Sequence, residues 1–161
     1  MQGSWSVNVK YVRRVFHRRS ETLFWQAISA CSVGACDVTI LVNAHGHSFS
    51  TKLTRADAVY RGHAVVNFIR CGKGPNSFPD PTTLKFRLRV TAAAGKHQAW
   101  AATSLAGTMI GSSKYVSAGA HYCPADTFKA MLSASANSRG REPAIGLQPA
   151  HLDRDQGTRA T

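Results

Sequence analysis

The segment from residue 84 to residue 90 constrains the fold more than any other part of the chain. Apolar residues alternate strictly with basic ones there, as Leu84, Phe86, Leu88 and Val90 against Lys85, Arg87 and Arg89. A period of two places successive side chains on opposite faces of an extended strand. One apolar face and one solvated face are typical of antiparallel sheets. The segment therefore predicts a half-buried antiparallel strand.

The same period recurs along the chain. Val7, Val9 and Tyr11 alternate with polar residues, and further strand-like runs lie at residues 23–25, 38–42, 49–53, 60–68 and 97–105. Turn-forming residues lie between them at 44–47, 72–76, 94–96 and 111–113. Residues 128–132 fit a short helix or a closing strand, and the strand is favoured. The pattern predicts an all-β barrel or sandwich of about eight strands, and consecutive hairpins favour an antiparallel up-and-down meander.

The composition changes after Leu132. A chain of 161 residues suits one domain. Residues 133–161, however, contain no Phe, Trp, Tyr or Val, and their large aliphatic residues are Ile145, Leu147 and Leu152. Such a segment cannot bury enough apolar surface to offset its conformational entropy. We therefore expect a β-barrel domain at residues 1–132 and a disordered C-terminal tail at residues 133–161.

The cysteines bear on the cellular compartment. They are Cys31, Cys36, Cys71 and Cys123, which allow three pairings. A bridge between Cys31 and Cys36 would close a small loop before a strand and leave Cys71 with Cys123. A thiolate metal site that borrows histidines, or four free thiols, are the alternatives. The disulfide interpretation is favoured, and it predicts an extracytoplasmic protein because disulfides form in oxidising compartments.

The sequence contains no recognisable targeting segment, although its cysteines predict an extracytoplasmic protein. No apolar run reaches the roughly 18 residues that a transmembrane helix needs. Residues 1–10 have neither the basic n-region nor the apolar h-region of a signal peptide. The extracytoplasmic location is thus predicted without a visible export signal.

Several short motifs occur in a recognisable order. They are Gly3-Ser4-Trp5-Ser6-Val7, Trp25-Gln26-Ala27-Ile28, Cys31-x4-Cys36-Asp37-Val38-Thr39, Tyr60-Arg61-Gly62, Cys71, Trp100-Ala101-Ala102-Thr103 and Gly107-Thr108. In this order they resemble an uncharacterised all-β domain of actinobacterial secreted proteins and lipoproteins, over residues 3–132. The resemblance implies an extracytoplasmic location and a β fold with two disulfides. It brings no catalytic residues.

The first of these motifs has a second resemblance. Gly3-Ser4-Trp5 is similar to the G-x-W that opens the first strand of lipocalins, in which the Trp closes one barrel end. The likeness implies a meander that closes into a lipocalin-like barrel. Such an interior could hold a small apolar ligand beside Trp5, Trp25 or Trp100, although aromatic residues in strands more often form the core.

The charge of the chain is strongly unbalanced. The chain has twenty Lys and Arg and eight Asp and Glu, which gives a net charge of +12. Sixteen of the basic residues and five of the acidic residues lie before residue 133. The excess therefore belongs to the predicted barrel. A basic outer surface would include Lys85, Arg87 and Arg89, with Arg13 and Arg14 as an extension. It could bind phosphates, an anionic membrane or acidic envelope polymers.

Nucleic acid is a less favoured partner. Binding of a single strand on a barrel usually needs exposed aromatic side chains on which bases stack. Phe86 alternates with the charged residues of its strand, so it is expected to face the core.

Catalytic and metal motifs are missing. The chain contains no G-x-S-x-G, H-E-x-x-H or phosphate-binding loop. His45 and His47 flank Gly46 and could begin a metal site, but without an evident third ligand a polar turn is favoured. The five carboxylates before residue 133 are scattered and form no local acid–base pair.

These observations predict a non-enzymatic, extracytoplasmic binding or sensing module, stabilised by disulfides and without a cofactor. Its basic outer surface would contact anionic cell-envelope components. The alternative is a lipocalin-like carrier of a small apolar ligand, and an enzyme at the barrel mouth is less favoured. An unfilled cavity beside the tryptophans would favour the carrier, whereas a filled core with clustered surface cations would favour surface binding.

Overall fold

The computed structural model describes residues 1–15, 18–29, 36–72, 77–96, 99–118 and 121–137, and within them the fold is all-β. The strands that form the main sheet are β1 (Gly3–Val15), β2 (Arg18–Ser29), β3 (Val38–Ala44), β4 (His47–Ala56), β5 (Val59–Val66), β8 (Thr82–Lys96), β9 (Ala99–Ser113) and β12 (Thr127–Ala136). Two short pairs lie outside it: β6 (Arg70–Cys71) with β7 (Phe78–Pro79), and β10 (Val116–Ala118) with β11 (His121–Cys123).

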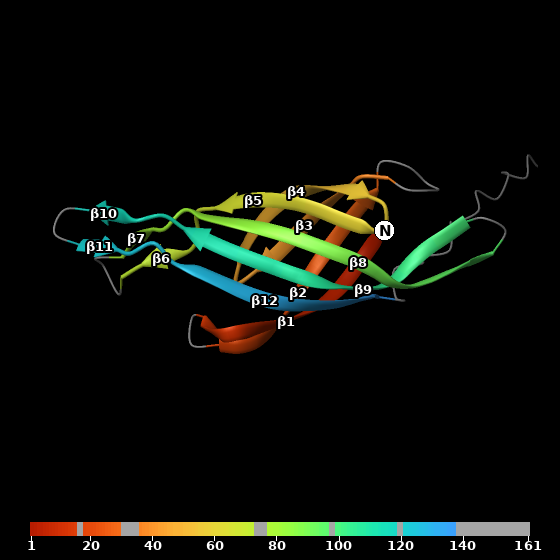
Figure 1. The fold of residues 1–161 in the computed structure, drawn as a ribbon, viewed down its shortest axis with the longest axis horizontal. Helices are drawn as coiled ribbons and strands as arrows, with labels where there is room; N and C mark the ends of the chain where they lie inside the picture. Colours follow the sequence, from red (N-terminus) through yellow and green to blue (C-terminus); the bar gives the residue numbers. More distant parts are fainter. Residues whose placement is uncertain (16–17, 30–35, 73–76, 97–98, 119–120, 138–161) are drawn as a thin grey trace, which may run out of the picture.

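The eight long strands close into a barrel. Their order around it is β1-β12-β9-β8-β5-β4-β3-β2, and every neighbouring pair is antiparallel (Figure 1). Each barrel strand therefore pairs with the next barrel strand along the chain, and β12 returns to β1. The predicted meander of about eight strands is confirmed.

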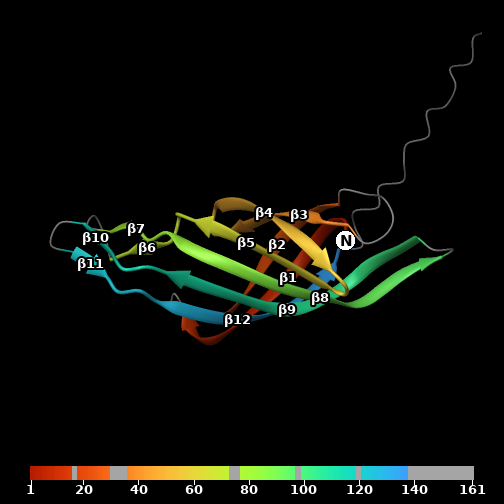
Figure 2. The same cartoon turned by 45° about the horizontal axis from the view of Figure 1, so that its top comes forward.

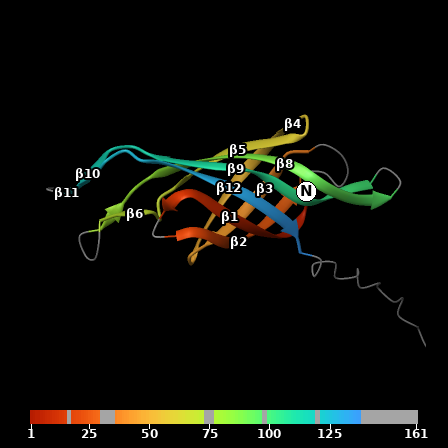
Figure 3. The same cartoon turned by 60° about the horizontal axis from the view of Figure 1, so that its bottom comes forward.

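Two extensions project from opposite ends of the barrel. The short pairs β6–β7 and β10–β11 lie beyond one end, and the β8–β9 hairpin continues beyond the other (Figures 2 and 3). A disulfide between Cys71 and Cys123 joins β6 to β11 and so ties the two short pairs together. Cys36 is also disulfide-bonded, and Cys31 lies outside the described residues.

The alternating pattern accounts for the core. Inward-facing residues of the long strands fill the barrel, and the largest of them with almost no exposure include Trp5, Tyr60, Ile40 and Leu53. Trp25 and Phe86 meet edge to face, with ring centroids 6.0 Å apart and planes at 89°. This geometry suits the quadrupoles of aromatic rings.

The barrel boundary lies further along the chain than the sequence predicted. Strand β12 extends past Leu132 to Ala136, with Ser133 opposite Asn8 and Ser135 opposite Ser6 of β1. Small alternating residues allow this continuation, since Ala134 is buried while Ser133 and Ser135 are exposed. The predicted start of the tail at residue 133 is thus wrong, and residues 138–161 lie outside the described residues.

Two predicted turns are in fact parts of strands. Residues 94–96 belong to β8, where Gly95 pairs with Trp100 of β9. Residues 111–113 belong to β9, where Gly111 pairs with Phe128 of β12. A Cβ at Gly111 would lie within 2.9 Å of Phe128 Cδ1, so the glycine makes room for the aromatic ring. By contrast, the predicted turn at 44–47 is confirmed, because His45 and Gly46 connect β3 to β4 with φ values of 52° and 78°.

No helix in the described ranges is long and apolar enough to cross a bilayer.

Candidate functional site

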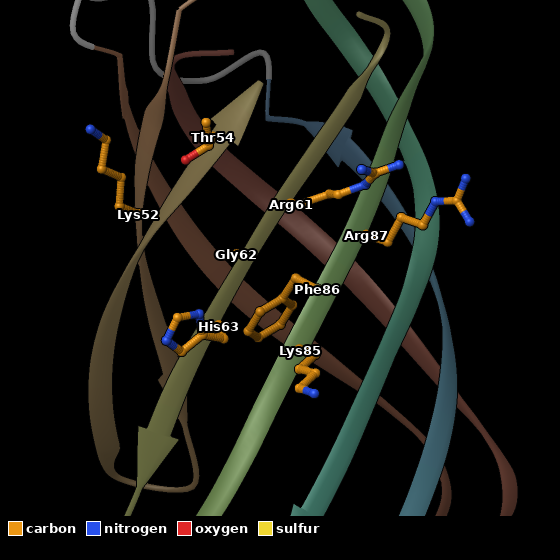
Figure 4. A pocket seen from close by; sticks show the side chains of 8 residues that line it. All are labelled: Lys52, Thr54, Arg61, Gly62, His63, Lys85, Phe86 and Arg87. Atoms are coloured by element: carbon orange, nitrogen blue, oxygen red, sulfur yellow. The ribbon is translucent and has the colours of Figure 1, made fainter. Parts of the chain in front are cut away.

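A groove on the outer face of the barrel gathers basic side chains from three neighbouring strands. It has a volume of about 700 Å³ and is lined by Lys52 and Thr54 of β4, Arg61, Gly62 and His63 of β5, and Lys85, Phe86 and Arg87 of β8 (Figure 4). The Phe86 side chain is 3% exposed, so the ring belongs to the barrel core beneath the groove. We call this site the basic groove.

Alternation along β8 supplies one side of the groove. Lys85, Arg87 and Arg89 are all exposed, as the sequence predicted, while Leu84, Phe86 and Leu88 are buried. The structure adds the opposite residues of β5: Arg61 pairs with Arg87, and His63 pairs with Lys85. In Figure 4 the Arg61 and Arg87 side chains extend in the same direction.

The strand pairing shapes the groove. Ladder pairing between β4 and β5 covers Thr54–Ala56 and Val59–Arg61 and does not continue to Lys52 and His63. Instead, the Thr51 hydroxyl donates a hydrogen bond of 2.6 Å to the His63 carbonyl. This bond gives the His63 carbonyl a partner where the ladder ends.

Gly62 lets the two strands approach at this point. A Cβ there would overlap the carbonyl oxygen of Lys52 and would lie 2.7 Å from Leu53 Cδ2. The glycine therefore sets how closely β4 crosses over β5, and with it the width of the groove.

The groove carries a strong excess of positive charge. Within the described residues, its one ion pair joins Lys52 Nζ to Asp37 Oδ2 at 2.9 Å, and Arg61, Lys85 and Arg87 have no carboxylate partner there. Like charges directly opposite each other in a sheet cost stability. The Arg61·Arg87 pair is therefore unfavourable for the barrel alone and suits an anion that both guanidinium groups contact.

The Lys52–Asp37 contact also changes the acidity of the carboxyl group. The pKa of Asp37 lies below its usual value, chiefly because of the hydrogen bond with Lys52 and then because the Arg55 backbone N–H donates to Oδ1 at 3.2 Å. Asp37 consequently stays ionised and holds Lys52 at the groove rim.

Sequence reasoning found part of this site. It identified Lys85 and Arg87, together with Arg89 on the same strand face outside the groove lining, but missed Lys52, Arg61 and His63. The alternation in β5 and β4 contains those positions, yet only the pairing of the strands shows that they share a face with β8. The side chains of Arg13 and Arg14, the predicted extension, lie outside the described residues.

The barrel interior offers far less space than the groove. Trp5 is fully buried in the core, Trp25 lines a cavity of about 60 Å³ at one barrel mouth, and the Trp100 side chain lies outside the described residues. Typical small-molecule sites have about 300–1,000 Å³. The cavity beside Trp25 is therefore smaller than a typical site of this kind.

A polar cluster borders that cavity. Tyr11 donates a hydrogen bond to Glu21, and His45 Nε2 lies 2.6 Å from the second Glu21 oxygen. His47 instead stacks on Phe68, with ring centroids 4.9 Å apart. Two histidines therefore do not converge on this carboxylate, and within the described residues no group of three His, Cys, Asp or Glu could hold a metal.

No family model and no curated protein matches the chain. In solved structures the chain is similar to the monomer form of the M. tuberculosis PknI sensor domain, with 12% sequence identity and a TM-score of 0.45, over 85% of this chain and 87% of that chain. The site is therefore interpreted from its own residues.

Proposed function

We propose that this protein is a non-enzymatic, extracytoplasmic binding module that recognises anionic groups through the basic groove. The observation that carries the proposal is the cross-strand Arg61·Arg87 pair beside the His63·Lys85 pair. An arrangement that costs stability in the free barrel becomes favourable when an anion accepts hydrogen bonds from both strands.

The disulfides support the extracytoplasmic part of the proposal. Cys71 is bonded to Cys123, no described cysteine is free, and disulfides persist in oxidising compartments. Acidic polymers and anionic headgroups of the cell envelope are partners that a basic groove could meet there.

Retention on immobilised dextran sulfate tests the groove. An Arg61→Gln/Arg87→Gln double variant should elute at clearly lower salt than the wild type, because two charge-assisted contacts are lost. A Lys10→Gln/Lys114→Gln variant has the same net charge, changes exposed residues outside the groove lining, and should elute close to the wild type. Equal elution of the two variants would show that net charge alone, and not the groove, binds the polymer.

A further inference from the structure

We propose, on the basis of the proposed function, that the groove ligand is a linear phosphodiester-type polyanion that lies along β8. The proposal specifies a row of at least three consecutive anionic groups, spaced at the interval of alternate residues in a strand. It goes beyond general anion binding because it predicts how affinity depends on the length and spacing of the polymer.

The first argument is the spacing of the cations on β8. Lys85, Arg87 and Arg89 are exposed on the same face of one strand. Alternate residues of a strand are about 6.7 Å apart, so the row spans about 13 Å. Successive phosphates of an extended phosphodiester chain recur at a similar interval. A flexible chain could therefore place one phosphate beside each cation.

The second argument is the cross-strand pairing. Arg87 lies opposite Arg61, and Lys85 lies opposite His63, whereas Arg89 lies opposite Val59. Two positions of the row thus offer hydrogen-bond donors from both strands, and the third offers a single guanidinium group. Guanidinium groups bind phosphate oxygens through paired N–H donors. We infer that the positions at Lys85 and Arg87 bind most tightly and that Arg89 adds a weaker third contact.

The third argument distinguishes a polymer from a membrane surface. The outer wall of a barrel is convex, so a flat bilayer meets it along few strands. Lys85 and Arg87 instead line a depression of about 700 Å³, and Arg89 continues their row along β8 outside that lining. A chain can enter a depression of this kind, whereas the plane of a bilayer cannot follow it.

The fourth argument concerns the chemical class of the polymer. Phe86 is the aromatic residue in the groove lining, and its ring is 3% exposed. The exposed ring in the groove lining is the His63 imidazole, which offers far less stacking surface than a row of Phe, Tyr or Trp side chains. Stacking is the main sequence-tolerant contact of single-stranded nucleic acids, so the groove is poorly equipped for bases. The groove thus fits a phosphate backbone without bases.

Synthetic abasic phosphodiester oligomers with one to six phosphates test the proposal by titration calorimetry on the full chain. Affinity should rise about fivefold per added phosphate up to three and then level off. For the trimer, the logarithm of affinity should fall with the logarithm of salt with a slope of about −2. Inorganic polyphosphate of equal charge has more closely spaced phosphates and should bind several times more weakly.

An Arg89→Gln variant sharpens the test. It should bind the two-phosphate oligomer like the wild type and gain nothing from the third phosphate. Lys114→Gln, a cation outside the groove lining, should leave the whole series unchanged.

The outcomes separate this inference from the proposed function. If one phosphate binds as tightly as three, or if phosphatidylglycerol vesicles bind while the oligomers do not, the linear-polyanion inference fails and anion binding stands. If neither oligomers, polyphosphate nor vesicles bind, the proposed function fails as well.

Discussion

Asp37 holds Lys52 at the rim of the basic groove, with 2.9 Å between the carboxylate oxygen and the ammonium nitrogen. The same carboxylate accepts the Arg55 backbone N–H. An asparagine can keep the second interaction and remove the first. Asp37→Asn should therefore free Lys52 and increase affinity for the three-phosphate oligomer by about two- to fivefold. Calorimetry checks this, and unchanged affinity would mean that Lys52 does not reach the ligand.

Stability should depend on pH through the same carboxyl group. The pKa of Asp37 is lowered in the folded protein, mainly by the hydrogen bond with Lys52. The contribution of Asp37 to stability is then present above the pKa of the unfolded chain and is lost as the pH falls through the folded-state value. Urea unfolding of wild type and Asp37→Asn should differ at neutral pH and converge in strong acid. A difference that stays constant with pH would contradict this assignment.

Substitution of Arg61 should make the protein more stable and weaken its binding of the phosphodiester oligomers. Because Arg61 faces Arg87 across the β5–β8 ladder, Arg61→Thr removes a like-charge contact and places a β-branched residue in a strand. The free energy of unfolding should rise by about 0.2–1 kcal/mol while affinity for the oligomers falls. Arg87→Thr in the Arg61→Thr background should give little further stabilisation, because the repulsion is already gone. Equal gains from the two substitutions would mean that the charges do not interact.

Gly107 should tolerate no side chain. A Cβ there would overlap the Arg87 carbonyl oxygen and lie 2.9 Å from Leu88 Cα, so β9 could not keep its distance from β8. Gly107→Ala should lower the free energy of unfolding by about 3 kcal/mol. Thr108→Ala, at the adjacent position, should change it by less than about 0.5 kcal/mol. Chemical denaturation checks both, and a stable Gly107→Ala protein would show that the two strands can separate there.

Loss of the Cys71–Cys123 disulfide should lower the stability of the protein without unfolding the barrel. The bridge closes a sequence separation of 52 residues and joins β6 to β11, which lie outside the main sheet. A Cys71→Ser/Cys123→Ser variant should lose about 2–4 kcal/mol. Its far-UV circular dichroism should still report a folded sheet at low temperature. An unchanged Tm would mean that the two short pairs are held together without the disulfide.

The fold was predictable because its main signal is local. The alternation around Phe86 repeats from β1 to β12, and a closed antiparallel meander needs little beyond consecutive hairpins. The errors concern small residues. Ser133–Ala136 resembled the start of a tail, and Gly111 resembled a turn, because sequence does not show that Ala134 is buried or that Phe128 needs the space above Gly111.

The site was only partly predictable because its residues lie on three strands, and only the pairing of those strands brings them together. Lys85 and Arg87 were visible as a stripe within one strand, but Lys52 lies 33 positions before Lys85 in the sequence. Its place in the groove depends on the end of the β4–β5 ladder and on the close approach at Gly62. The resemblance to actinobacterial secreted domains stays a prediction.

The return of β12 to β1 has a consequence for the order of the strands. Trp5 pairs with Ala136, and the Asn137 N–H donates a hydrogen bond of 2.9 Å to the Ser4 carbonyl. The first and last barrel strands are therefore joined by a ladder of seven residue pairs, although the backbone is not covalently continuous there. A short linker from Asn137 to Gly3, with new termini opened between His45 and Gly46, should give a circular permutant that builds the same barrel.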